Sequence, residues 1–257
     1  MHDHRKARRL ESLYRVLKDR QLIPAVHLPR DRLIDRLKPQ LDPDRLALIK
    51  PRKHIDHLMG IIWMVRMICQ FMRHGEYQGE ATIYSHREVL DLIRDMAQQL
   101  LPEKQSRFIG DRLHLQEVHD GETKRIIGHD VTFFDIQSTK AKQYGFCMDL
   151  GDGKKLTCCG DEPYDACEEM YAKNSEWLLH EAFCLYAQRD IFDPYEKHHS
   201  TVKDACQLAE KLNVRNLLLY HTEDQNLNQR KRLYAEEGAQ YYHGRLLIPD
   251  DLESYEL

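Results

Sequence analysis

The sequence predicts an α/β domain over residues 54–257, because helical and strand-like patterns alternate along that stretch. The apolar run Leu58–Met72 is long enough for a buried helix, and Glu88–Leu101 has the pattern of an amphipathic helix that ends at Pro102. Short runs of strand-forming residues lie between and after these helices, at 81–84, 131–136, 146–150, 155–159, 177–181 and 216–220.

Local signals support the order of these elements. The step Asp152-Gly153 lies between two of the strand-like runs and is a strong signal for a β-hairpin. Ser200 or Thr201 supplies an N-cap for a helix that continues to Leu212. A strand is then expected to follow that helix.

Residues 1–53 differ in character from the rest of the chain. They hold 15 Lys and Arg against 7 Asp and Glu, a net charge of +8, whereas residues 54–257 have a net charge of −12. The first glycine is Gly60, and five of the nine prolines precede residue 54. We expect short basic helices, poorly packed and interrupted by proline. A basic arm that binds RNA phosphates is a second interpretation, although no aromatic side chain other than Tyr14 accompanies the charges.

The composition excludes several classes of protein. No run of about 18 apolar residues predicts a membrane-spanning helix, and the first residues lack the apolar stretch of a secretory signal. Seven unevenly spaced cysteines, an odd number, are more typical of reduced thiols than of a disulfide framework. We therefore expect a cytoplasmic protein without a membrane partner.

Residues that can bind a metal ion fall at the ends of predicted strands. His54, Asp56 and His57 stand directly before the first apolar helix, and Asp161 and His221 each follow an apolar strand. His180 and Glu181 end another strand in the same manner. Imidazole and carboxylate groups are ligands of Zn²⁺ and Mn²⁺, and an α/β site forms where strand ends meet.

These motifs, in this order, resemble the metallo-β-lactamase superfamily and in particular its ribonuclease Z-like members. The runs that carry the resemblance are His54-x-Asp56-His57-x-x-Gly60, Gly160-Asp161-Glu162-Pro163-Tyr164, His180-Glu181-Ala182-Phe183, His199-Ser200-Thr201 and His221. The resemblance implies an αββα sandwich with a metal centre along its edge.

The resemblance also implies roles for single residues. Asp56, His57 and His221 would hold one metal ion, Asp161 would bridge to a second ion, and His54 would belong to that other site. Asp56 would also orient or deprotonate the attacking water. His199 would stabilise charge on the scissile phosphate or donate a proton to the leaving group.

Two positions depart from the pattern of the superfamily. Arg52 stands where the first histidine of the motif is expected, and Gln137 replaces a histidine after the strand at 131–136. Arginine stays protonated and cannot be a ligand, and a glutamine offers only a neutral amide oxygen. We therefore expect one competent metal site and one degraded site.

The superfamily also opens with glycine-containing strands, and residues 1–53 show none, so we expect the N-terminal strands to be missing or replaced. Two explanations compete. The segment is a divergent arm, or it is translated out of frame up to Lys53 or His54. Loss of those strands would expose a sheet edge, which favours a homodimer.

The predicted function is that of a metal-dependent hydrolase of a phosphodiester, RNA included, or of another small ester, with one or two Zn²⁺ ions or Mn²⁺. Only 24 positions separate Gln137 from Asp161, which leaves no room for the inserted arm used in tRNA processing. The alternative is a catalytically weak or inactive metal-binding or interaction protein of the same fold, supported by Arg52 and Gln137.

Overall fold

The computed structural model describes residues 22–24, 45–49, 55–250, 253 and 255. For residues 22–24, 45–49, 55–57 and 59 it describes the backbone alone. The chain forms two compact units. Unit 1 comprises the residues up to His119 together with Tyr255, and unit 2 runs from Asp120 to Glu253.

Unit 1 contains a four-stranded parallel sheet in chain order. Its strands are β1 (Leu22–Pro24), β2 (Arg45–Ile49), β3 (Glu80–Ser85) and β4 (Leu113–Glu117). Parallel neighbours need crossover connections, which helices usually supply. The helix α4 (Ile55–His74) connects β2 to β3, and α5 (Arg87–Leu100) and α6 (Glu103–Ser106) connect β3 to β4.

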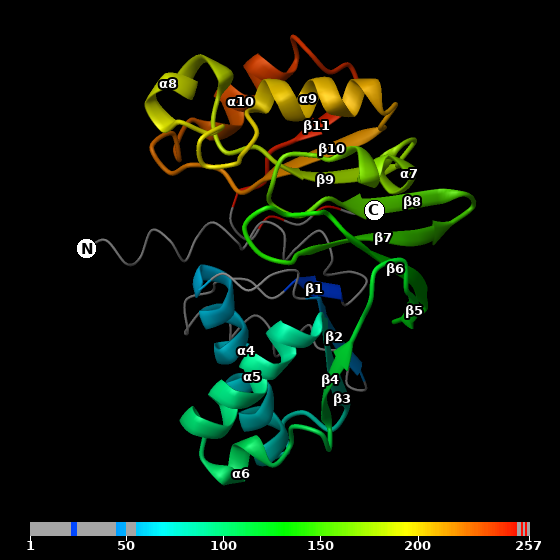
Figure 1. Cartoon of the computed structure of the whole chain (residues 1–257), viewed down its shortest axis with the longest axis vertical. Coiled ribbons are helices and arrows are strands. Elements are labelled where there is room, and N and C mark those ends of the chain that lie inside the picture. Colours follow the sequence, from blue (N-terminus) through cyan, green and yellow to red (C-terminus); the bar gives the residue numbers. More distant parts are fainter. Residues whose placement is uncertain (1–21, 25–44, 50–54, 251–252, 254, 256–257) are drawn as a thin grey trace. The chain divides into compact units, whose positions relative to one another are not determined.

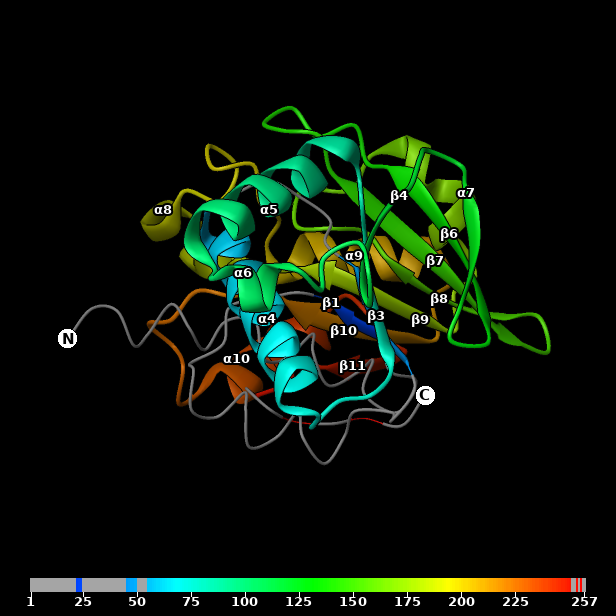
Figure 2. The same cartoon turned by 90° about the horizontal axis from the view of Figure 1, so that it is seen from below.

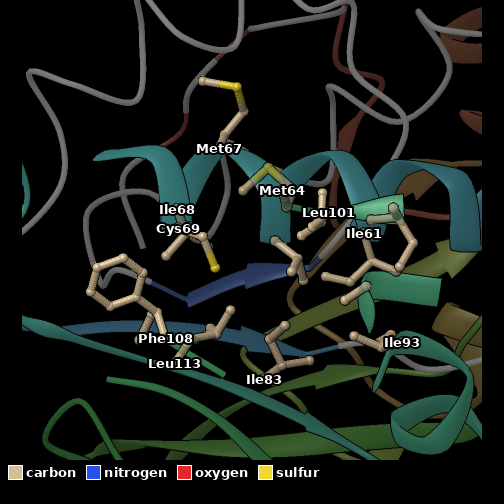
Figure 3. Packing of buried hydrophobic residues seen from close by; sticks show 14 of the residues in the cluster. Ile61, Met64, Met67, Ile68, Cys69, Ile83, Ile93, Leu101, Phe108 and Leu113 are labelled. Carbon is tan, nitrogen blue, oxygen red and sulfur yellow. The ribbon is translucent and has the colours of Figure 1, made fainter. Parts of the chain in front are cut away.

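The core of unit 1 lies between α4 and the sheet. Ile61, Ile68 and Cys69 of α4 point toward Ile83 and Leu113 of the strands (Figure 3). All five side chains are at most 3% exposed. The prediction of a buried helix over the apolar run is confirmed.

Unit 2 contains a seven-stranded mixed sheet with the order β11-β10-β9-β8-β7-β6-β5. The pairs from β5 to β8 are antiparallel, and the pairs from β8 to β11 are parallel, so β8 joins the two halves of the sheet (Figure 2). The seven strands are β5 (Thr123–Ile126), β6 (His129–Asp135), β7 (Tyr144–Gly151), β8 (Lys154–Cys158), β9 (Trp177–Glu181), β10 (Asn216–Tyr220) and β11 (Arg245–Leu247).

Helices pack on the parallel half of this sheet. The helix α9 (Val202–Lys211) lies along β9 and β10, and α10 (Arg230–Gly238) contacts α9 and β11 (Figure 1). Two shorter helices, α7 (Glu169–Ala172) and α8 (Arg189–Phe192), lie in the connections between strands. Ala205 and Ala209 of α9 are fully buried in the same apolar cluster as Leu178 and Leu217 of the strands.

The predicted hairpin joins β7 to β8. Asp152 has φ 53° and Gly153 has φ 73°, so both turn residues occupy the left-handed region that a tight two-residue turn requires. These two strands and their turn fill most of the stretch between Gln137 and Asp161, as the sequence predicted.

The described residues within 1–53 are strands where we expected helices. Arg45–Ile49 pairs with β3 from Arg45↔Glu80 to Ile49↔Tyr84, so a strand does precede the His54 motif. Arg52, Lys53 and His54, together with most of the segment, lie outside the described residues. The prediction of poor packing therefore stays a prediction.

We predict that Gly145→Ala destabilises unit 2. A β-carbon at Gly145 would lie 2.4 Å from the Phe134 ring and 2.7 Å from the carbonyl oxygen of Cys158. Forced repacking of this kind costs about 1–3 kcal/mol of unfolding free energy, measured by urea titration. Lys154→Ala, an exposed change in the neighbouring strand, is the control and should shift the value by less than about 0.5 kcal/mol. Equal values for the two variants would contradict the prediction.

Candidate metal centre

Three parallel strands of unit 2 end close together at one edge of the sheet, β8 two residues before the level at which β9 and β10 end. Leu179 of β9 pairs with Cys158 on one side and Leu218 on the other, and Tyr220 pairs with Glu181. Whatever follows these strands in the chain is therefore brought to one edge. Polar ends of apolar parallel strands are where α/β proteins build their sites.

Asp161 reaches this edge through a turn after β8. Gly160 has φ 78°, and a β-carbon there would lie 3.0 Å from the Gln143 amide nitrogen. That amide nitrogen donates a hydrogen bond of 2.8 Å to Oδ1 of Asp161. The other carboxylate oxygen, Oδ2, lies 3.7 Å from Nε2 of His221.

His221 leaves β10 in a left-handed conformation with φ 55°, which is uncommon for a residue other than glycine. Hydrogen bonds of the residues before and after His221 hold its backbone in place. The N–H of Ala182 donates to the carbonyl of Tyr220 (2.9 Å), and the N–H of Glu223 donates to the carbonyl of Phe183 (2.7 Å). The conformation is thus fixed by hydrogen bonds to the segment that follows β9.

Glu181, the last residue of β9, is fully buried. Its Oε1 accepts a hydrogen bond from the backbone N–H of Ser200. Its Oε2 lies 3.6 Å from Nδ1 of His199, and neither of these two atoms has a hydrogen-bond partner among the described residues. A buried carboxylate with one oxygen left over is costly unless a cation lies beside it.

His199 is positioned by the start of α9. Thr201 is the N-cap, and its hydroxyl and backbone N–H both donate to Oδ2 of Asp204, at 2.6 and 2.9 Å. The His199 ring stacks on Phe183, with ring centroids 5.1 Å apart, and lies 4.7 Å from the ring of His221. Both imidazoles therefore face the same small volume.

Glu181, His199 and His221 are one group of side chains that fits a metal ion. One ligand atom from each lies within 4.8 Å of the others. The donor atoms of a tetrahedral zinc site are about 3.3 Å apart. The separations of 3.6 Å in the Glu181–His199 pair and 3.7 Å in the Asp161–His221 pair are near that value. The two carboxylates and two imidazoles match the ligand types of Zn²⁺ and Mn²⁺.

Another buried carboxyl group, that of Glu168, lies in the segment between Asp161 and β9. Burial raises its pKa from 4.5 to about 8, although Oε1 accepts a hydrogen bond from the N–H of Asp165. The folded chain thus keeps a proton that the unfolded chain releases, so this group lowers stability as the pH rises from about 4.5 to about 8. Burial also raises the pKa of the Tyr220 hydroxyl well above its usual value, so the residue before His221 stays neutral.

The structure brings together Asp161, His199 and His221 of the predicted site residues. His54 lies outside the described residues, and for Asp56 and His57 only the backbone, in the first turn of α4, is described. Their predicted roles as metal ligands, and that of Asp56 as a catalytic group, stay predictions.

Two participants were missed from the sequence. Glu181 ends a predicted strand, but the resemblance assigns it no role; the signal that identifies it is its place at the end of a fully buried strand. Gln143 carries no signal in the sequence, because nothing in its local pattern indicates that it contacts Asp161. Gln137, by contrast, is exposed, and its backbone N–H donates to Oδ1 of Asp135.

The profile of the β-lactamase superfamily domain matches residues 35–222, which is most of the chain and all of the edge described above. The chain belongs to the metallo-β-lactamase superfamily. The resemblance inferred from the sequence, to the ribonuclease Z-like branch, is confirmed. The match includes residues 35–53, part of the segment whose reading frame was in question.

Curated sequences similar to this superfamily member include several named ribonuclease Z. That of Brevibacillus brevis is 28% identical over 192 residues, which cover 70% of this chain and 58% of the relative. That of Staphylococcus carnosus is 30% identical over 106 residues, which cover 41% of this chain and 34% of the relative. The chain thus aligns with about a third to somewhat over half of the length of these relatives.

Solved structures confirm the fold. PqqB of Methylobacterium extorquens, a zinc-bound protein, has a TM-score of 0.66 at 16% identity, covering 93% of this chain and 84% of its own. The metallo-β-lactamase fold protein YhfI of Bacillus subtilis has a TM-score of 0.63 at 16% identity (86% and 79%). The short form of human tRNase Z has a TM-score of 0.56 at 16% identity (84% and 83%).

We predict that Thr201→Ala lowers the stability of the protein by weakening the start of α9, the helix that follows His199. The change removes the hydroxyl that caps α9, which typically costs about 1 kcal/mol of unfolding free energy in thermal or urea denaturation. Thr201→Ser keeps the hydroxyl and should retain most of that stability. A loss of the same size in both variants would show that the cap is not the cause.

Proposed function

We propose that this superfamily member is a metal-dependent hydrolase that cleaves phosphodiesters. The observation that carries the proposal is the pairing at one edge of the sheet: Asp161 with His221, and Glu181 with His199. Each pair sets a carboxylate against an imidazole, and the two imidazoles are neighbours. Ribonuclease Z is the name of the similar curated sequences, which supports a phosphodiester as the substrate class.

In this proposal Asp161 and His221 hold the metal ion. An ion held there would activate water and would neutralise charge on the phosphate oxygens. The hydrogen bond from Gln143 orients the Asp161 carboxylate, so that Oδ2 is the oxygen directed at His221. Outer hydrogen bonds of this kind fix the direction of a metal ligand.

His199 serves as the proton donor to the leaving oxygen. Its Nδ1 faces the Glu181 carboxylate, so Nε2 is the nitrogen that exchanges a proton with the substrate. The Ser200 N–H holds that carboxylate in place beside the imidazole. Stacking on Phe183 fixes the plane of the ring.

Further parts of the proposal extend beyond these four residues. His54, Asp56 and His57 are proposed as additional ligands, with Asp56 orienting the water, and Zn²⁺ as the ion, Mn²⁺ being the alternative. No helix in the described part of the chain is long and apolar enough to cross a membrane. A location in the cytoplasm and a homodimer remain predictions.

A second candidate function is a metal-binding protein with little or no catalytic activity. Gln137 supports it, because this residue replaces a histidine ligand of the superfamily and its side chain is exposed. Arg52 was the other reason for it, and it lies outside the described residues. A protein with this second function would bind a metal ion but would not hydrolyse a phosphodiester.

We predict that His221→Ala lowers metal binding. Loss of a residue that only orients a ligand costs about 10–100-fold in affinity, so loss of the ligand should cost at least about tenfold. The measurement is metal content by mass spectrometry after dialysis against graded chelator. His243→Ala, which removes an exposed imidazole, should leave the affinity unchanged. Metal binding that survives His221→Ala, or purified chain that binds neither Zn²⁺ nor Mn²⁺, would refute the proposal.

We predict that His199→Ala lowers kcat for bis-p-nitrophenyl phosphate by about 10²-fold or more, while the metal content stays the same. Proton transfer by a positioned side chain contributes about 10²–10⁴-fold. Loss of metal together with activity would instead make His199 a ligand, in the group with Glu181 and His221. A wild-type protein that binds metal without hydrolysis would favour the second candidate function.

A further inference from the structure

Three consecutive basic residues begin α10, and only the first of them is buried. Arg230 is 4% exposed, whereas the side chains of Lys231 and Arg232 are 42% and 58% exposed. Arg230 shares the buried face of the helix with Tyr234 and Gly238, at the four-residue spacing of one helical face. A guanidinium group stays charged, and its burial is costly unless its protons find acceptors. The chain thus keeps a buried cation where an apolar side chain would cost less.

The Arg230 guanidinium joins two segments of the chain. Its Nη1 donates a hydrogen bond of 2.8 Å to the hydroxyl of Thr222, the residue that follows His221. Its Nη2 donates a hydrogen bond of 3.3 Å to the carbonyl of Pro249, after β11. Among the described residues its ion pair is with Asp250, which is 3.9 Å away and 59% exposed, and Nε has no hydrogen-bond partner there. The bonds to Thr222 and Pro249 are therefore the main contacts of the group.

The same face of α10 also contacts the segment that follows β9. The hydroxyl of Tyr234 donates a hydrogen bond of 3.1 Å to the carbonyl of Phe183. That carbonyl also accepts the backbone N–H of Glu223, at 2.7 Å. One face of α10 thus holds both the segment after β9 and the segment after β10, which carry residues of the metal centre.

His221 needs support of this kind because of its backbone. The left-handed conformation, with φ 55°, is unfavourable for a residue with a β-carbon and persists only where the surrounding structure imposes it. Backbone hydrogen bonds fix Tyr220 before it and Glu223 after it. The bond from Arg230 to Thr222 adds a constraint at the very next residue. It limits rotation of the peptide between His221 and Thr222, and that rotation sets the direction of the imidazole.

We propose that Arg230 is a positioning residue of the metal centre, which holds Thr222 and so keeps the His221 imidazole directed at Asp161. This inference rests on the proposed function, in which Asp161 and His221 hold the ion. Arg230 acts through Thr222 and not by contact with the ion. The planar guanidinium suits this role, because it presents several donors in a fixed geometry and so reaches two acceptors at once.

The first test is the affinity of the full chain for Zn²⁺, measured by competition with a chromophoric chelator. Arg230→Met fills a similar volume without a donor and should raise the Kd for Zn²⁺ by about tenfold or more. Arg230→Lys keeps the charge and one donor group and should recover part of the affinity. Tyr242→Phe is the matched control, because it removes a buried hydroxyl that donates to the carbonyl of Val214, before the start of β10. It should lower Tm and leave the Zn²⁺ affinity unchanged.

Thr222→Val removes the acceptor but keeps the shape of the side chain, so it tests whether Arg230 acts through Thr222. The double variant Thr222→Val/Arg230→Met should bind Zn²⁺ no more weakly than Arg230→Met alone, because both changes break the same bond. Additive losses would overturn the inference. An Arg230→Met variant with the same Zn²⁺ affinity as Tyr242→Phe would overturn it as well.

The second test needs no metal ion. In metal-free protein with ¹³C-labelled histidine, the Cα chemical shift of His221 reports its backbone conformation, and the peak is identified by its loss in His221→Ala. Arg230→Met should move this peak and Tyr242→Phe should not. If Arg230→Met does not fold, Thr222→Val and Arg230→Lys replace it in both tests.

A His221 peak that stays in place when the bond to Thr222 is removed overturns the inference, whatever the Zn²⁺ affinity. Wild-type protein that binds no Zn²⁺, while the peak still moves in Arg230→Met, would refute the proposed function. The positioning of His221 by Arg230 would then stand without it.

Discussion

The register of three parallel strands is the constraint on which the site depends. Strands β9 and β10 are buried along their whole length and β8 over its last three residues, and all three are held by main-chain hydrogen bonds, so their ends cannot move independently. The next backbone contacts extend this order past the strands, from Ala182 to Tyr220 and from Phe183 to Ser200. The side chains of the site therefore leave a rigid frame, and their separations are set by the sheet.

Within that frame the Glu181 carboxylate is the group that most needs a cation close to it. It is removed from water, and one N–H from Ser200 satisfies only one of its oxygens. A buried carboxylate of this kind is stable only beside a cation, and a metal ion in the site would supply one. The same requirement links the Asp161–His221 pair to the Glu181–His199 pair, since a cation that enters the site is attracted to the carboxylates of both Asp161 and Glu181.

Much of this arrangement followed from the sequence, because polar residues that end apolar strands are a direct consequence of sheet geometry. Asp161, His199 and His221 were predicted on that ground and from the order of motifs. Glu181 received no role because, in the pair His180-Glu181, the sequence does not say which residue faces the site. Strand alternation decides it: Leu178 and Ala182 lie in the apolar cluster packed by α9, so Glu181 points to the other face. Gln143 could not be found, because its contact with Asp161 spans two strands.

The two described strands within the first 53 residues show the opposite case, because there the composition favoured helices. The absence of glycine and the many charges suggested helices, yet Arg45–Ile49 is a strand of five residues in parallel register with β3. Charged residues on both sides of this short apolar run hide the strand pattern in the sequence. Together with a family match that begins at residue 35, this strand counts against a change of reading frame immediately before His54.

His221 shows that stability and chemistry can have opposite requirements at one position. Its left-handed backbone carries about 1–2 kcal/mol of conformational energy that glycine would not have. A glycine there would relax the chain while it removed the imidazole. Selection of variants for resistance to heat alone would thus tend to replace the imidazole on which the proposed chemistry depends. A more heat-resistant variant would therefore not be expected to keep a functional metal site.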